Sequence, residues 1–178
     1  MSSLFNHIFI PLVILLLFSK NLKLNSREVI ALSFFAVLPD TDTLFFVLKL
    51  SSTSLHRVLF HNAFILVIPL LCFIFVKSRR EAFGIISFYL SSHLILDLFS
   101  GGIFLFYPFY NSVFYANVEL LLSNDSFTPA LEYGISNKIM NNGIGEPAIS
   151  SENIAVALLL IASAAISARG NFRKTKLE

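Results

Sequence analysis

Long apolar runs separated by short charged loops are the feature that most restricts how this chain can fold. Of its 178 residues, 56% are hydrophobic and only 13% are charged, whereas globular proteins carry about 25% charged residues. Several runs approach the roughly 20 residues that a helix needs to cross a bilayer. The sequence therefore predicts an all-α, polytopic membrane protein that forms one membrane domain over residues 1–178.

The apolar runs predict about five transmembrane helices, of which the second is kinked. Pro39 lacks a backbone N–H and disfavours helix at Leu38, so the second helix should bend there. Aromatic residues 103–110 are too few to span and predict an interfacial or re-entrant piece. The expected spans cover residues 4–18, 29–50, 60–76, 82–99 and 153–168. We expect the metal-site core within residues 4–110 and a partly irregular outer loop region at 111–152, which contains a short surface helix near 118–122. A basic tail follows at 169–178.

The distribution of basic residues predicts the orientation of the chain. With the N-terminus outside and the C-terminus cytoplasmic, ten of the 13 Lys and Arg residues lie on the inner side, as the positive-inside rule requires in an inner or plasma membrane. This pattern accounts for the net charge of +2 without a nucleic-acid partner, and the expected partner is the lipid bilayer. The single Cys72 excludes an intrachain disulfide and a thiolate-cluster metal site.

Ionisable residues inside the apolar runs predict a functional site. His93 and Asp97 lie four residues apart and therefore share one face of the fourth helix. An unpaired charge at such a depth costs several kcal/mol, so a partner is expected. In the predicted topology all four histidines and three of the four aspartates fall in one outer layer: His7, Asp40, Asp42, His56, His61, His93 and Asp97.

Imidazoles and carboxylates together suit Zn²⁺, Mn²⁺ or Fe, and with more carboxylates also Mg²⁺. His56 is five residues from His61 and so lies on another helical face, where it could act as a general acid. Arg57 could bind a phosphate oxygen pair, or could anchor the helix at the headgroups. The candidate ligands, for one or two ions with Zn²⁺ preferred, are His7, Asp40, Asp42, His61, His93 and Asp97.

Simpler interpretations of the same residues remain open. His93 and Asp97 could form a hydrogen bond that joins two helices, and His7 could be an interior histidine with a local partner. Asp40 or Asp42 could cap a helix that restarts after Pro39, because Asp is a favoured N-cap residue. Capping by one aspartate is compatible with metal binding by the other.

Three motifs together resemble one known family. They are Leu38-Pro39-Asp40-x-Asp42, His56-Arg57-x3-His61 and Ser92-His93-x3-Asp97, with His7 upstream. Over about residues 7–109 they resemble the YdjM-like family of inner-membrane metal-dependent hydrolases, which implies a helical membrane protein with a divalent-metal site. The His-x3-Asp pair is also distantly similar to the zinc-dependent phospholipase C and nuclease group, which implies phosphoester hydrolysis by analogy.

We therefore expect a membrane-embedded metal-dependent hydrolase that acts on a lipid or small-molecule phosphoester at the extracytoplasmic face. Water activated by the metal would be the nucleophile, and His56 would protonate the leaving group. An ion- or proton-coupled transporter is one alternative, although the cytoplasmic halves of the runs lack the polar residues it needs. A non-catalytic metal-binding membrane scaffold is the other.

Overall fold

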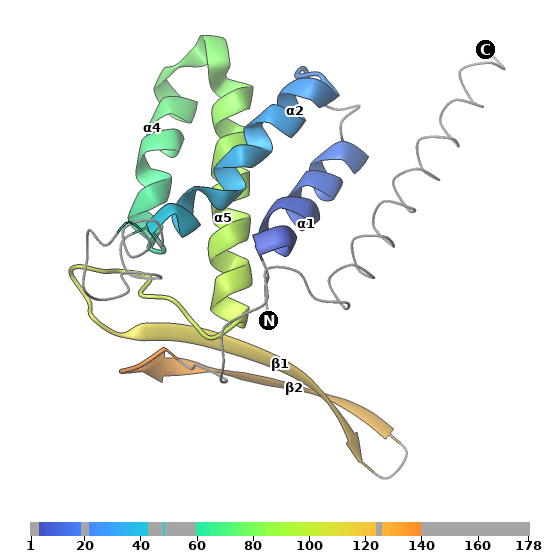
Figure 1. Ribbon diagram of the computed structural model, residues 1–178, viewed down its shortest axis with the longest axis vertical. Coiled ribbons are helices and arrows are strands. Elements are labelled where there is room, and N and C mark those ends of the chain that lie inside the picture. Colours follow the sequence, from blue (N-terminus) through green and yellow to red (C-terminus); the bar gives the residue numbers. More distant parts are fainter. Residues whose placement is uncertain (1–3, 19–21, 43–47, 49–59, 124–125, 140–178) are drawn as a thin grey trace, which may run out of the picture.

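A computed structural model of the chain describes residues 4–18, 22–42, 48, 60–123 and 126–139. Figure 1 shows the helices gathered around α5, with a two-stranded hairpin crossing near the C-terminal end of that helix. The described α-helices are α1 (Leu4–Leu17), α2 (Ser26–Leu32), α4 (Val67–Phe75) and α5 (Arg80–Phe99). The 3-10 helices are η2 (Ser33–Asp42), η3 (Ala63–Leu66) and η4 (Lys77–Arg79), and the strands are β1 (Val113–Ser123) and β2 (Ser126–Ser136).

Helix α5 is the central element, and it contacts α1, α2, η2, η3, α4 and β1. Its buried residues Ile85 and Tyr89 pack with Val29 and Ala36 in the main hydrophobic core. The Tyr89 hydroxyl donates a hydrogen bond of 3.0 Å to the carbonyl of Val29. This bond and the apolar contacts hold α2 and the start of η2 against the middle of α5.

The chain changes from α-helix to 3-10 helix at Ser33. The Ser33 N–H bonds to the Ile30 carbonyl, which is the three-residue spacing of a 3-10 helix. Burial then follows the same period, because the buried residues of η2 are Ser33, Ala36, Pro39 and Asp42. The predicted break at Leu38–Pro39 is therefore wrong, because the chain stays helical through Pro39, which lies on the buried face of η2, and only the type of helix changes, at Ser33.

A sharp turn after α5 brings the hairpin to the end of that helix. Gly102 has a φ of 90°, which glycine adopts without the strain that a side chain would cause. A Cβ atom at Gly102 would lie 2.5 Å from Cγ1 of Val113. Ile103 then forms a bridge with Phe114, and β1 pairs antiparallel with β2 from Val113↔Ser136 to Ser123↔Ser126.

The prediction of an all-α protein with about five transmembrane helices is wrong. Among the residues that the structure describes, only Lys77–Phe99 is long and apolar enough to cross a membrane. Helix α1 has 14 residues and extends over about 21 Å, which is less than the roughly 30 Å of a bilayer core. The apolar helix at Ala63–Phe75 is also shorter than a span.

The prediction of an irregular outer loop is wrong for residues 113–123 and 126–136, which form the paired strands β1 and β2. The short helix expected near 118–122 is instead part of β1. The last predicted span at 153–168 and the tail at 169–178 lie outside the described residues.

Candidate metal centre

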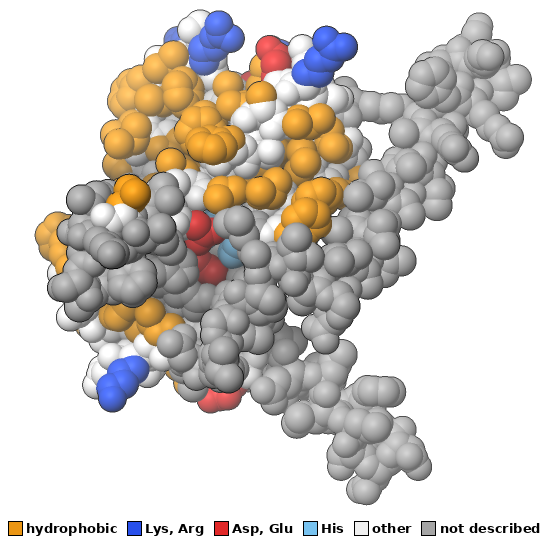
Figure 2. All heavy atoms as spheres, in the orientation of Figure 1, with side chains coloured by type: hydrophobic (Ala, Val, Ile, Leu, Met, Phe, Trp, Pro, Cys, Tyr) orange, Lys and Arg blue, Asp and Glu red, His pale blue; other side chains and the backbone are white. Residues whose placement is uncertain are grey.

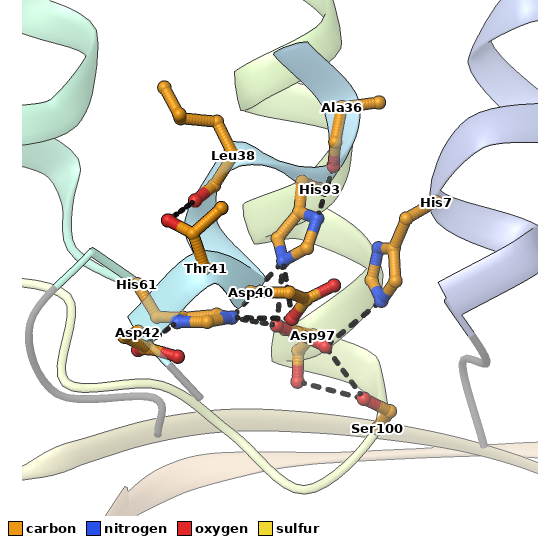
Figure 3. Close-up of polar contacts among 10 residues, drawn as sticks. All are labelled: His7, Ala36, Leu38, Asp40, Thr41, Asp42, His61, His93, Asp97 and Ser100. Carbon is orange, nitrogen blue, oxygen red and sulfur yellow. Dashed lines mark hydrogen bonds and ion pairs between the residues drawn. The ribbon is translucent and has the colours of Figure 1, made fainter. Parts of the chain in front are cut away.

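Side chains from four segments meet near the C-terminal end of α5 (Figure 3). Five of the six are almost completely buried, and the sixth, Asp40, has a side chain that is 18% exposed. The predicted residues His56 and Arg57 lie outside the described part of the chain. The six that converge are His7 from α1, Asp40 and Asp42 from η2, His61 from the chain before η3, and His93 and Asp97 from α5.

The local structure of η2 and η3 places three of these residues. Because η2 has about three residues per turn, Asp40 and Asp42 lie on different faces, and Asp42 continues the buried row. The Asn62 side chain accepts a hydrogen bond of 3.1 Å from the Phe64 N–H and caps η3. This cap fixes the backbone directly after His61.

Potential ligand atoms of four residues lie close together at the centre of the site. Nε2 of His61 lies 3.1 Å from Nε2 of His93, 3.1 Å from Oδ2 of Asp97 and 3.3 Å from Oδ1 of Asp40. Nε2 of His93 lies 3.3 Å and 3.6 Å from the same two oxygens of Asp97 and Asp40. Nε2 of His61, Nε2 of His93 and an oxygen of Asp97 form one group that could hold a metal ion, and Asp40 belongs to a second group with His7 and His93.

Hydrogen bonds to the other ring nitrogens orient both histidines toward this centre. Nδ1–H of His93 donates to the Ala36 carbonyl at 2.6 Å, and Nδ1–H of His61 donates to Oδ2 of Asp42 at 3.1 Å. Since these oxygens only accept, each neutral ring presents the lone pair of Nε2 to the centre. Asp40 thus lies at the ligand group, whereas Asp42 lies behind His61.

His61 has a strongly perturbed pKa. Burial alone lowers its pKa, but hydrogen bonds to Asp40, Asp42 and Asp97 more than offset this and raise the pKa to about 10. In the absence of a metal, His61 is therefore an imidazolium at neutral pH, with one proton on Nε2. That proton lies where a cation would bind, so metal binding has to release it.

His7 and Ser100 contact the other oxygen of Asp97. Nε2 of His7 lies 3.4 Å from Oδ1 of Asp97, and its ring stacks on His93 with centroids 3.9 Å apart. The Ser100 hydroxyl donates to the same Oδ1 at 3.3 Å. His7, Asp40 and His93 also form a group with ligand atoms within 4.8 Å of one another, so His7 could bind an ion.

Sequence reasoning did not identify Ser100 or the Ala36 carbonyl. The position of Ser100, three residues after Asp97, was the available signal for its contact. The Ala36 contact comes from the backbone, so no side-chain pattern could show it. The described residues thus include His and Asp groups that could bind a metal, with a donor set of nitrogen and oxygen that suits Zn²⁺.

Comparison with known proteins supports the family resemblance. The family model described as YdjM inner membrane protein matches residues 1–173. No curated protein and no solved structure matches the chain. The distant similarity to zinc-dependent phospholipases C therefore stays a prediction.

Proposed function

Because this chain belongs to the YdjM inner membrane protein family, we propose that it is a membrane-embedded enzyme that hydrolyses a phosphoester with a divalent metal ion. The observation that carries this proposal is that Nε2 of His61 and Nε2 of His93 lie 3.1–3.6 Å from each other and from one oxygen each of Asp40 and Asp97. Without a metal ion, the proton on Nε2 of His61 compensates the nearby carboxylates, and a bound cation would take the place of that proton.

Each residue of the site has a distinct part in this proposal. His61, His93, Asp40 and Asp97 would hold the ion, which when bound supplies a Lewis acid that polarises a phosphoryl oxygen and lowers the pKa of water. Asp42 and the Ala36 carbonyl fix the two imidazole rings. Their role is to keep the ligand atoms in place before substrate binds.

Asp40 is the residue through which the candidate metal centre is most exposed to its surroundings. Its side chain is 18% exposed, against 0% for His61 and 3% for Asp97. Figure 2 shows acidic and histidine atoms visible from one face of the molecule, recessed below neighbouring hydrophobic side chains. A substrate phosphate would therefore approach from Asp40. On sequence grounds, His56 would protonate the leaving group and Arg57 would bind the phosphate.

Basic residues suggest how the site is oriented in the membrane. Lys77 and Arg79 lie in η4, between α4 and α5, and Arg80 begins α5, at the opposite end of that helix from Asp97. The backbone N–H of Lys23 donates to Glu81 at 2.6 Å, so the α1–α2 connection lies at that basic end too. By the positive-inside rule this end faces the cytoplasm and the metal site faces the extracytoplasmic side.

The test is a hydrolysis assay on purified, chelator-treated protein with Zn²⁺, Mn²⁺ or Mg²⁺ added back. The substrate panel contains soluble and lipid phosphomonoesters and phosphodiesters. We expect metal-dependent turnover that Asp40→Asn lowers by about 100-fold or more, because the variant removes a charged ligand. Glu132→Gln, on the exposed strand β2, is the matched control and should keep wild-type activity.

The proposal fails if the wild-type protein binds the metal but hydrolyses none of these esters. In that case the ion has the structural role of joining η2 and the His61 segment to α5, as in the scaffold alternative.

A further inference from the structure

The three-residue period of η2 places an exposed apolar row next to the metal centre. Phe34, Val37 and Asp40 are three residues apart and so lie in one line along η2. Phe34 is 69% exposed, and Val37 is partly exposed. Ile30, which is 50% exposed and four residues before Phe34, extends the line onto α2. We call Ile30, Phe34 and Val37 the apolar row.

The length of the apolar row fits one leaflet of a bilayer. With about 1.5 Å per residue in α2 and about 2.0 Å in η2, Ile30 and Asp40 are separated by about 18 Å along the axis. The hydrocarbon of one leaflet is about 15 Å thick, half of the roughly 30 Å core. A lipid whose phosphate lies at Asp40 therefore has an apolar surface beside most of its acyl chain.

The end point of the row distinguishes it from other exposed apolar surface. Helix α4 also exposes large apolar side chains, such as Ile68 at 73% and Phe75 at 75%, as is usual for surface that contacts lipid. The apolar row differs because it ends at Asp40, the most exposed carboxylate of the metal centre. An apolar surface and the most exposed carboxylate of the candidate metal centre are thus adjacent along α2 and η2. A water-soluble phosphoester would use only the metal centre.

We propose that the site takes a membrane lipid with phosphate in its headgroup. The lipid reaches the metal centre sideways from the bilayer, with one acyl chain along the apolar row and the phosphate on the Asp40 side of the ion. The row runs from the site toward the basic end of the helices, so the acyl chain points into the membrane. This inference rests on the proposed function, because it assumes that the site holds a metal ion that binds phosphate. It concerns how the lipid binds and not whether the lipid is hydrolysed.

The experiment uses two photoreactive lipids with the same diazirine-bearing acyl chain. One is a phosphonate analogue of phosphatidic acid, which cannot be hydrolysed, and the other is the matching diacylglycerol without phosphate. The full-length protein in nanodiscs is irradiated with each probe, with Zn²⁺ or after chelation, and labelled peptides are mapped by mass spectrometry. With Zn²⁺, the phosphonate should label residues 30–37 about tenfold more than α4, whereas the diacylglycerol should label both similarly.

Phe34→Ser should remove most of this preference, because it deletes the largest apolar contact of the row. Phe75→Ser is the matched control and should leave the preference unchanged. Equal labelling of residues 30–37 and α4 by both probes, or a preference that persists after chelation, would overturn the inference. Labelling of the row without hydrolysis of any ester would contradict only the proposed function, and hydrolysis without such labelling would contradict only this inference.

Discussion

His61 contacts carboxylates with both of its ring nitrogens. Nδ1 bonds to Asp42, and Nε2 lies near Asp40 and Asp97. In the proposed metal-loaded site these carboxylates would have different tasks: Asp40 and Asp97 would bind the ion, and Asp42 would orient the ring. Single substitutions can therefore separate ligation from orientation.

Asp42→Ala should weaken Zn²⁺ binding by about 10–100-fold, the usual effect of losing the outer partner of a ligating histidine. Asp42→Asn should weaken it less, because the amide oxygen still accepts from Nδ1–H of His61. Asp97→Ala should abolish binding. A competition titration with a chromophoric chelator measures all three, with Glu132→Ala as the control. An Asp42→Ala protein that binds Zn²⁺ as tightly as wild type would contradict the assigned role.

The pKa of His61 predicts how the metal-free protein responds to pH. Its folded pKa of about 10 lies above the ordinary histidine value of 6.5, so the protonated ring stabilises the fold fully below pH 6.5. This contribution is lost as pH rises through about 10. The Tm of chelated wild-type protein should thus fall over that range more than the Tm of His61→Gln. Parallel Tm profiles for the two proteins would refute this linkage.

The helical elements show what the apolar pattern could predict. Helices at Leu4–Leu17 and Arg80–Phe99 match apolar runs, and the spacing of His93 and Asp97 correctly placed both on one face of α5. The 3-10 form of η2 could not be predicted, because the same residue types form α-helices. The sequence therefore could not decide between Asp40 and Asp42. Their separation depends on the three-residue period that buries Asp42.

The hairpin was the main structural feature that the sequence reasoning missed. The segment at 118–122 has good helix formers, and Pro129 in β2 argues against a strand in the middle of a sheet. The alternation of exposed Leu131, Tyr133 and Ile135 with polar or small residues was the available signal. A two-stranded sheet tolerates Pro129 because each strand has an unpaired edge.

Gly102→Ala should destabilise the connection between α5 and β1 by about 3 kcal/mol, from positive-φ strain and overpacking. The added Cβ would lie 2.5 Å from Val113 and 2.7 Å from the Phe114 carbonyl. Thermal unfolding in detergent measures the change. Gly84→Ala is the matched control: its Cβ would lie 3.2 Å from the Phe73 ring, so its effect should be much smaller. Equal Tm values for Gly102→Ala and wild type would contradict the described turn.

In the molecule as a whole, the site is a place where segments far apart in sequence meet. The ligand group connects η2, the segment before η3, and α5. Three buried or partly buried carboxylates at one place destabilise the metal-free fold unless a cation or protons compensate them. A bound divalent ion would supply this compensation and stabilise the folded state.

Zn²⁺ at about 1,000 times its Kd should stabilise the fold by about 4 kcal/mol. For a chain of this size that corresponds to a rise in Tm of about 10 °C relative to chelated protein. His93→Ala should show little of this rise, because it removes one ligand and the contact with Ala36. A similar rise in wild-type and His93→Ala protein would show that the ion acts elsewhere.

The most direct test of a shared metal centre is elemental analysis of protein purified without chelators. Wild-type protein is compared with the double variant His93→Ala/Asp97→Ala, which lacks the α5 half of the ligand group. We predict about one divalent ion per wild-type chain and almost none in the variant. Equal, negligible metal in both preparations would contradict the account.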